Sequence, residues 1–234
     1  SWEIRGSYPK ILEEPGANDL YRDAQNILQK MNAEGWVKPR GVLGFFPAFS
    51  RGDNIIISGK YLLPTLRQQI MKKADQPNLA LADYLEPEGG KPDFIGALAV
   101  SPGEGVLKLA EWYRSQEDEY NGILAQSVGD RLAEAFAEYI HAQARQIWGF
   151  PEETERGVRP APGYPACPDH TQKKLLFQLL NATELAGMTL TESCMMYPAS
   201  SVSAWIFSHP QSTYFSVGPI GKDQEELLEK GSWE

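Results

Sequence analysis

The sequence predicts an α+β fold rather than a doubly wound parallel sheet. Two observations support this class: helix-like and strand-like segments occur together in the chain, and they do not follow a regular strand–helix–strand order. The length of 234 residues suits one large domain or two small ones, and it is sufficient for a single sizeable core. We find no internal repeat and no low-complexity tract.

Six segments are expected to be helical, most of them because apolar residues recur every three or four positions. The first has Asn18 or Asp19 in place to cap its start, and Gly35 follows its end. The clearest signal runs from Ile123 to Ile140 without an internal proline, which predicts a long amphipathic helix. The expected helices are residues 19–31, 66–73, 106–114, 120–148, 171–181 and 222–230.

Six other segments are expected to form strands. The apolar run at residues 41–46 is typical of a buried strand, and residues 54–58 follow it after a turn that contains Gly52. Another apolar run is closed by Pro102 and Gly103. Beyond residue 190 the sequence alternates as a sheet does. The expected strands are residues 41–46, 54–58, 93–100, 191–197, 202–207 and 214–217.

Charge and composition exclude several classes of protein. With 22 basic and 31 acidic residues the net charge is −9, which argues against nucleic-acid binding and against docking on an anionic membrane. No apolar run is long enough to span a bilayer, and Ser1 is not followed by a secretory leader. We therefore expect a cytoplasmic protein, and a chain that begins with Ser1 suggests a fragment of a longer one.

Cysteine and histidine usage favours a reduced, metal-free domain. Two cysteines, Cys167 and Cys194, are too few for a disulfide framework at this size. The three histidines lie far apart in the sequence, and none forms a pair at metal-ligand spacing. His209 is interpreted as a packed structural histidine.

Motifs for common enzyme chemistries are absent from the sequence. There is no phosphate-binding P-loop, no dinucleotide glycine motif and no nucleophile elbow. The triplet at residues 103–105 is too short to count as a phosphate loop. The sequence thus does not indicate a stand-alone acyl or phosphoryl transferase.

The most unusual segment is residues 159–170, which we call the strap and which contains four prolines. Each proline fixes its own φ and favours an extended predecessor, so the strap should be stiff and neither helical nor part of a ladder. Arg159 offers a fork for a carboxylate, Gly163 permits a close approach to the backbone, and Tyr164 offers a flat face. These features suit S-adenosylmethionine, whereas the alternative is a rigid structural crossover.

The strap closely resembles a signature of the activation domain of cobalamin-dependent methionine synthase. Further blocks resemble the family in the same order along nearly the whole chain, and they lie at residues 7–12, 39–42, 93–97, 130–136, 190–193 and 207–210. The resemblance implies a single domain over residues 1–234, built on a curved antiparallel sheet with flanking helices.

The resemblance also implies a reaction. Such a domain binds S-adenosylmethionine and presents its methyl group for the reductive methylation of inactive cob(II)alamin, with an electron from a flavodoxin-type reductase. The cobalamin is carried by a neighbouring domain of the same methyltransferase, and zinc belongs only to modules that this sequence does not contain. The domain alone is not expected to make methionine. The alternative is a docking module that recognises the cobalamin domain or the reductase without binding the methyl donor.

Family analogy assigns the ligand-binding residues. They are Arg159, the backbone of Pro160 and Ala161, Gly163, Tyr164, and the pair Tyr214 and Phe215. The family usually has two tyrosines at that pair, so one hydroxyl is missing here. A further ligand-binding Asp is implied upstream of Trp2, before this sequence begins. From the residues alone, the aromatic pair would be interpreted as core or cross-strand packing.

Asp130 and Glu134 lie one turn apart on the long predicted helix. From sequence alone they indicate a solvated helix face. The resemblance implies contact with the cobalamin domain, where carboxylates of this helix approach the histidine that leaves cobalt. Met195, Met196 and Tyr197 are interpreted as strand core or as an adaptable surface near the corrin.

Overall fold

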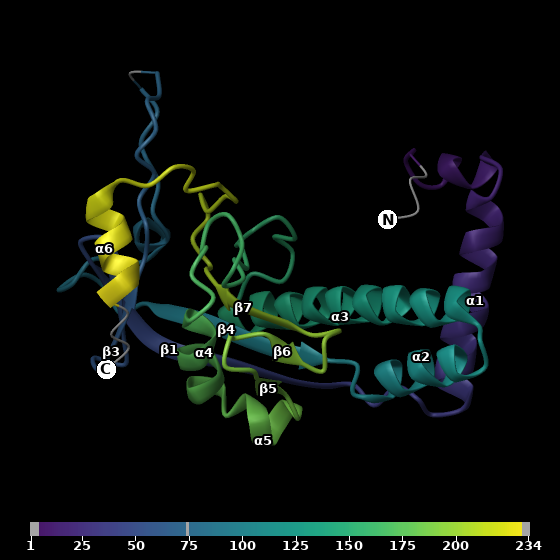
Figure 1. Ribbon diagram of the computed structural model, residues 1–234. Helices are drawn as coiled ribbons and strands as arrows, with labels where there is room; N and C mark the ends of the chain where they lie inside the picture. The colour runs from purple at the N-terminus through teal and green to yellow at the C-terminus, as the bar shows by residue number, and fades with distance from the viewer. Residues whose placement is uncertain (1–4, 74, 231–234) are drawn as a thin grey trace.

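The computed structural model describes residues 5–73 and 75–230, with side chains up to Glu226, and Trp2 lies outside these residues. Figure 1 shows a sheet crossed by one long helix, with a shorter helix standing at the far end of that helix. The helices are α1 (Ala17–Ala33), α2 (Gly105–Ser115), α3 (Glu119–Trp148), α4 (Gln172–Leu180), α5 (Ala182–Ala186) and α6 (Lys222–Lys230), with 3-10 turns at Lys10–Glu13 and Leu81–Tyr84.

The main sheet is antiparallel throughout, with five strands in the order β3-β2-β1-β4-β7. Its strands are β1 (Arg40–Arg51), β2 (Asn54–Ile57), β3 (Tyr61–Pro64), β4 (Phe94–Ser101) and β7 (Val202–Ile206). A short ribbon pairs β5 (Thr189–Leu190) with β6 (Met196–Tyr197). The sheet is curled, and helices flank it (Figure 1), so the predicted α+β class and the curved antiparallel sheet are confirmed.

Each face of the sheet has its own core. On β7, Trp205 points into a large cluster shared with α4 and α5, whereas Ala204 and Ile206 point into the cluster beneath α3. This is the two-residue alternation of a strand buried on both faces. A Cβ at Gly96 would lie 2.8 Å from the Trp148 ring, so α3 ends in close contact with β4.

The helix α3 joins the sheet to a separate helical arm. Asp118 caps its start by accepting a hydrogen bond from the Asn121 amide at 3.0 Å, and Gly149 ends it in a left-handed conformation. Its first half packs with α1 and α2 around Met31 and Leu109, and its second half lies on the sheet. The two halves of one continuous helix therefore serve two different cores.

Two predicted elements are wrong. Residues 66–73 are not helical, because Arg67 and Gln68 bond to residues distant in sequence: Nε2 of Gln68 donates to the Ser216 carbonyl at 2.7 Å, and Arg67 pairs with Asp53 and Asp83. Residues 214–217 belong to no strand, although the Val217 amide donates to the Pro165 carbonyl at 2.9 Å. Long-range side-chain contacts override the local pattern in both places.

The other predicted elements are confirmed with shifted ends. The first strand extends to Arg51, and only residues 196–197 of the expected strand 191–197 are paired. The helices near residues 19–31, 106–114, 120–148, 171–181 and 222–230 all form. The sequence analysis missed β3, α5 and the short strand β5.

Candidate functional site

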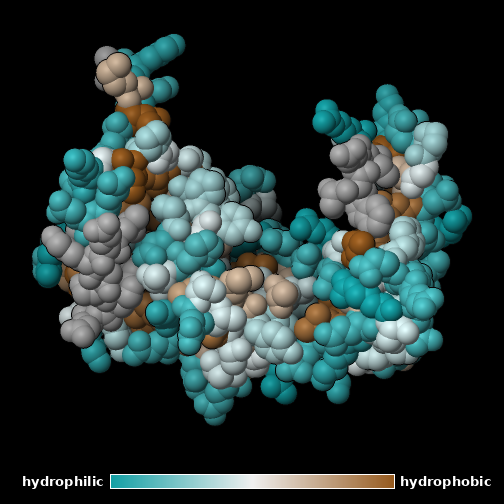
Figure 2. Space-filling view, viewed as in Figure 1, coloured by the Kyte–Doolittle hydropathy of each residue, from teal (hydrophilic) through white to brown (hydrophobic). Residues whose placement is uncertain are grey.

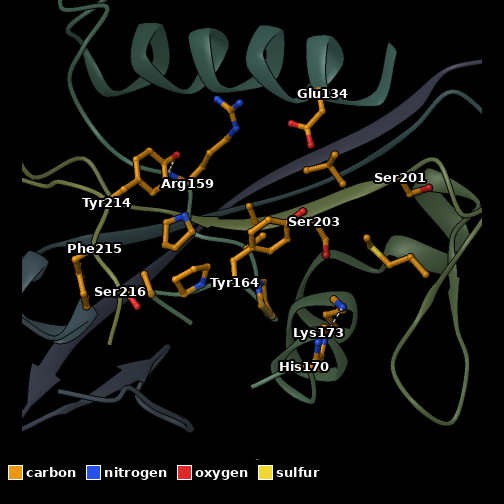
Figure 3. Close-up of a pocket in the computed structure, with 18 residues that line it drawn as sticks. Glu134, Arg159, Tyr164, His170, Lys173, Ser201, Ser203, Tyr214, Phe215 and Ser216 are labelled. Carbon is orange, nitrogen blue, oxygen red and sulfur yellow. Dashed lines mark hydrogen bonds between the residues drawn. The ribbon is translucent and has the colours of Figure 1, made fainter. Parts of the chain in front are cut away.

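A cavity of about 590 Å³ lies beside the free edge of β7, beneath the second half of α3 (Figure 3). Its walls come from distant parts of the chain: α3, the strap, the start of α4, Met196, residues 201–204 and residues 214–216. Six of the seven residues predicted to bind the ligand line this cavity, namely Arg159, Pro160, Ala161, Tyr164, Tyr214 and Phe215.

The strap follows the edge of β7 for a short distance and then leaves it. Val158 and Phe207 exchange two backbone hydrogen bonds, at 2.9 and 3.1 Å, and the Trp205 amide donates to the Pro160 carbonyl at 3.1 Å. Because proline has no N–H, residues 160 and 162 cannot donate to a ladder, and no such pairing continues toward Ser203 among the described residues. The cavity lies where this pairing stops.

Arg159 is held at the cavity rim by its backbone and by its side chain. Its amide donates to the Tyr214 hydroxyl at 3.0 Å, a bond drawn in Figure 3. Its guanidinium rises toward α3, where Nη1 donates to Oε2 of Glu138 and lies 3.4 Å from Nδ1 of His141. The fork predicted from sequence is therefore present, with one of its nitrogens already paired.

The electrostatics of this cluster keep Glu138 charged and His141 neutral. The hydrogen bond from Arg159 lowers the pKa of Glu138 below its usual value. Burial, together with Arg145 and Arg159, lowers the pKa of His141 to about 4. Near neutral pH the cluster thus holds two guanidinium groups, one carboxylate and a neutral imidazole.

The two acidic residues predicted on the long helix have different surroundings. Glu134 points from α3 toward the cavity and makes no hydrogen bond or ion pair with the described residues (Figure 3). Asp130 accepts a hydrogen bond from the Ser200 hydroxyl at 2.7 Å and lines a separate hollow between α1 and α3. The structure therefore brings Glu134, but not Asp130, together with Arg159.

Aromatic side chains form one wall of the cavity. Tyr164 is 63 % exposed and Tyr214 64 % exposed, so both present ring surface to a ligand. Phe215 is half-buried and packs edge-on against Tyr84, with ring centroids 6.3 Å apart. The pair at 214–215 therefore combines an exposed tyrosine with a packed phenylalanine.

Gly163 does not line the cavity. It has a φ of +100°, and a Cβ there would lie 2.2 Å from the His170 ring. The group that approaches its backbone is thus the imidazole of the same strap, not a ligand as the sequence suggested. Glycine is required here by conformation and by packing.

Sequence reasoning missed the polar groups at the other end of the cavity. Lys173 is buried, and its ammonium bonds to Nδ1 of His170 at 2.9 Å and to the Cys194 carbonyl at 3.1 Å. Ser201 and Ser203 also line the cavity, and their buried hydroxyls have no hydrogen-bond partner within the described chain. Burial lowers the pKa of Lys173. No local pattern distinguishes these residues, because their contacts depend on the fold.

The described residues show neither a metal-binding cluster nor a membrane-spanning helix. Residues 5–73 and 75–230 contain no group of three or more His, Cys, Asp or Glu that could hold a metal ion. Within that part of the chain, no helix combines the length and the apolarity needed to cross a bilayer. Cys167 and Cys194 are both free and buried.

The fold and the cavity define an α+β protein with an aromatic-walled cavity of small-molecule size, lined by both an arginine and a carboxylate. The sequence matches the family described as "Vitamin B12 dependent methionine synthase, activation domain" over residues 1–230. The chain belongs to this family.

A solved structure agrees with this assignment. The chain is 42 % identical to the protein in a crystal structure described as the MetH reactivation domain bound to AdoHcy, with a TM-score of 0.90. The similarity covers 98 % of this chain and 78 % of the other. The resemblance inferred from the strap is thereby confirmed.

Proposed function

We propose that the cavity binds S-adenosylmethionine and that the domain presents the methyl group to a cobalamin held by a neighbouring domain, which reactivates methionine synthase. The observation that supports this most directly is the convergence of Arg159, Glu134 and the aromatic wall on one cavity. A second support is the similar MetH domain, whose structure is described as bound to AdoHcy, the product left after methyl donation.

The residues present fit the chemical groups of this ligand. Arg159 matches a carboxylate, and Glu134 matches an ammonium or a sulfonium, because each is an opposite charge at the rim. Tyr164 and Tyr214 offer ring faces for the adenine or for the cationic sulfur. The volume of about 590 Å³ lies within the usual range for ligand pockets.

The backbone of the strap is partly engaged before any ligand binds. The Pro160 carbonyl already accepts from Trp205, and the Ala161 carbonyl from Tyr164. Each carbonyl oxygen retains a second lone pair for a ligand hydroxyl or amine. We therefore propose that the backbone of Pro160 and Ala161, which these hydrogen bonds already hold in place, contacts the amino-acid and ribose portions of the ligand.

The domain's contribution to the reaction is positioning rather than acid–base catalysis. S-adenosylmethionine supplies an electrophilic methyl group and a reductase supplies one electron, so that cob(II)alamin becomes methylcobalamin and S-adenosylhomocysteine remains. Arg159 and Glu134 orient the donor, and the cavity wall holds the nucleoside. No proton is transferred, so no general base is required.

The partners follow from this role. We propose that the cobalamin domain of the same enzyme and a flavodoxin-type reductase approach this domain in the cytoplasm. Asp130 and Glu134 are proposed to face the cobalamin domain, and Glu134 also lines the ligand cavity. We expect the isolated domain to bind the methyl donor without making methionine.

Calorimetric titration of the domain with S-adenosylmethionine tests the proposal. We expect saturable binding in the micromolar to millimolar range and competition by S-adenosylhomocysteine. Absence of heat up to millimolar ligand would contradict it. That result would instead favour a docking module without donor binding, an alternative supported by the missing hydroxyl at Phe215 and by the engagement of Arg159 with Glu138.

A further inference from the structure

Glu138, which does not line the cavity, contacts the arginine that we assign to the ligand carboxylate. Its Oε2 accepts a hydrogen bond from Nη1 of Arg159. The side chain of Arg159 is 19 % exposed, whereas that of Glu138 is 58 % exposed. The ion pair thus lies at the rim, with the guanidinium on its inner side.

The geometry of a guanidinium decides what this contact leaves available. Arginine has five N–H donors in a planar fork, and a carboxylate can bind either across the two Nη atoms or along the Nε–Nη2 edge. Glu138 and His141 both lie at Nη1 of Arg159. The Nε–Nη2 edge makes no hydrogen bond with the described residues, so one complete bidentate edge remains for a ligand.

A second arginine ion-pairs with the same carboxylate. Nη2 of the buried Arg145 lies 4.0 Å from Oε1 of Glu138. The buried imidazole of His141 is neutral near pH 7, so it adds no further positive charge beside the two arginines. Among the described residues, Glu138 is the carboxylate that ion-pairs with both guanidinium groups.

We propose that Glu138 is a positioning residue, which holds Arg159 so that its Nε–Nη2 edge binds the carboxylate of the ligand's amino-acid portion. This inference rests on the proposed function of the cavity. Without Glu138, the long arginine side chain would have to be ordered by the ligand itself, at a cost in affinity. Glu138 is one turn beyond Glu134, so α3 supplies one carboxylate to the cavity and another to its arginine.

A double-mutant cycle measured with S-adenosylhomocysteine by calorimetry tests this role. We expect Glu138→Gln to weaken binding about tenfold in the wild-type background and less than about twofold in an Arg159→Ala background, because the glutamate acts through the arginine. Glu111→Gln is the matched control, because Glu111 is exposed on α2 and its substitution removes the same charge. Glu138→Asp should recover part of the affinity.

A second ligand and a second variant separate positioning from stability. 5′-Methylthioadenosine lacks the amino-acid portion, so Glu138→Gln should leave its affinity within about twofold. Because Glu138→Gln also removes the countercharge of Arg145, the variant Glu138→Gln/Arg145→Met should regain thermal stability without regaining affinity for S-adenosylhomocysteine.

The outcomes distinguish this inference from the proposed function. Equal losses in both arginine backgrounds, equal losses for both ligands, or tighter binding by Glu138→Gln would overturn the positioning role while leaving the cavity as the binding site. A wild-type domain that binds no S-adenosylhomocysteine would overturn both.

Discussion

Two hollows of similar size lie beside α3, and they differ in the groups that line them. One has a volume of about 590 Å³ and the other, between α1 and α3, about 510 Å³. The first gathers an arginine, a glutamate, a lysine and aromatic rings from separate segments. The second lies between two helices and is lined by aliphatic side chains together with polar ones, which include Asp130 and Arg131. We propose the first hollow as the binding site because its charged and aromatic groups converge from separate segments, whereas volume does not distinguish the two hollows.

The two ends of the molecule are also separated on its surface (Figure 2). A broad hollow separates the sheet end of the molecule from the arm that contains α1. The second half of α3 carries Ala133, Ala137 and Ala144 on its buried side, which lets the helix lie close to the sheet. The first half packs around larger residues such as Leu124. One continuous helix therefore packs against other helices in its first half and borders the proposed binding cavity with its second half.

The largest expected effect tests whether the arm is independent of the cavity. Met31→Ala removes a fully buried side chain from the arm core and should lower the free energy of unfolding by about 2–5 kcal/mol. Affinity for S-adenosylhomocysteine should stay within about twofold where the variant is folded, since the cavity contains no residue of α1. Urea unfolding and calorimetry measure the two quantities. A parallel loss of affinity would show that the arm and the cavity are coupled.

The next variant contrasts the two hollows directly. Arg159→Ala should weaken S-adenosylmethionine binding by about 1.5–3 kcal/mol, as expected for a charge-assisted hydrogen bond. Gln25→Ala, in the hollow between α1 and α3, should leave the affinity unchanged. Calorimetry at one salt concentration compares them. Unchanged binding by Arg159→Ala would remove this residue from the site.

The buried imidazole of His141 predicts that the stability of the protein depends on pH. The pKa of His141 is about 4 in the folded protein against an ordinary 6.5, so the unfolded chain binds a proton that the folded chain excludes. Stability should therefore fall as the pH is lowered from about 6.5 to 4, by about 1–3 kcal/mol.

His141→Gln should flatten this part of the stability curve. Urea unfolding at several pH values compares it with the wild type. The low pKa of Glu138 adds a further loss of stability at still lower pH in both proteins. The contribution of His141 is therefore the difference between the two stability curves. Parallel curves for the two proteins would mean that His141 titrates normally.

The smallest effect concerns ligand charge. Glu134→Gln should weaken the binding of the sulfonium ligand S-adenosylmethionine by about 1 kcal/mol more than the binding of the neutral thioether S-adenosylhomocysteine. Competition calorimetry gives both affinities for one preparation. Asp130→Asn, one turn away and outside the cavity, should not change the ratio of the two affinities. An unchanged ratio in Glu134→Gln would assign this carboxylate to another part of the ligand.

Much of the fold could be predicted from local signals. The long helix was visible because apolar residues repeat without a proline, and strand β4 because an apolar run ends at Pro102. The helix predicted at residues 66–73 was wrong because their apolar spacing resembles that of a helix. Arg67 and Gln68 instead bond to residues far along the chain. Such bonds leave no local pattern.

The candidate site was predicted in part for the same reason. Seven strap and aromatic residues were assigned to the ligand by resemblance to the family, and all of them except Gly163 line the cavity. Lys173, Ser203 and Glu138 were missed, because a lysine or a glutamate on a helix is typical of a solvated surface. Only the packing of α3 and α4 around β7 brings Lys173 and Ser203 to the cavity and Glu138 to Arg159.

The sequence by itself determined the stiffness of the strap, the length of α3 and the family, since proline chemistry and helical periodicity act on neighbouring residues. The tertiary structure alone decided that Glu134 faces the cavity, that Asp130 bonds to Ser200 instead, and that Arg159 is shared between Tyr214 and Glu138. Those contacts join residues 21 to 70 positions apart, so they exist only once the sheet and its helices have packed.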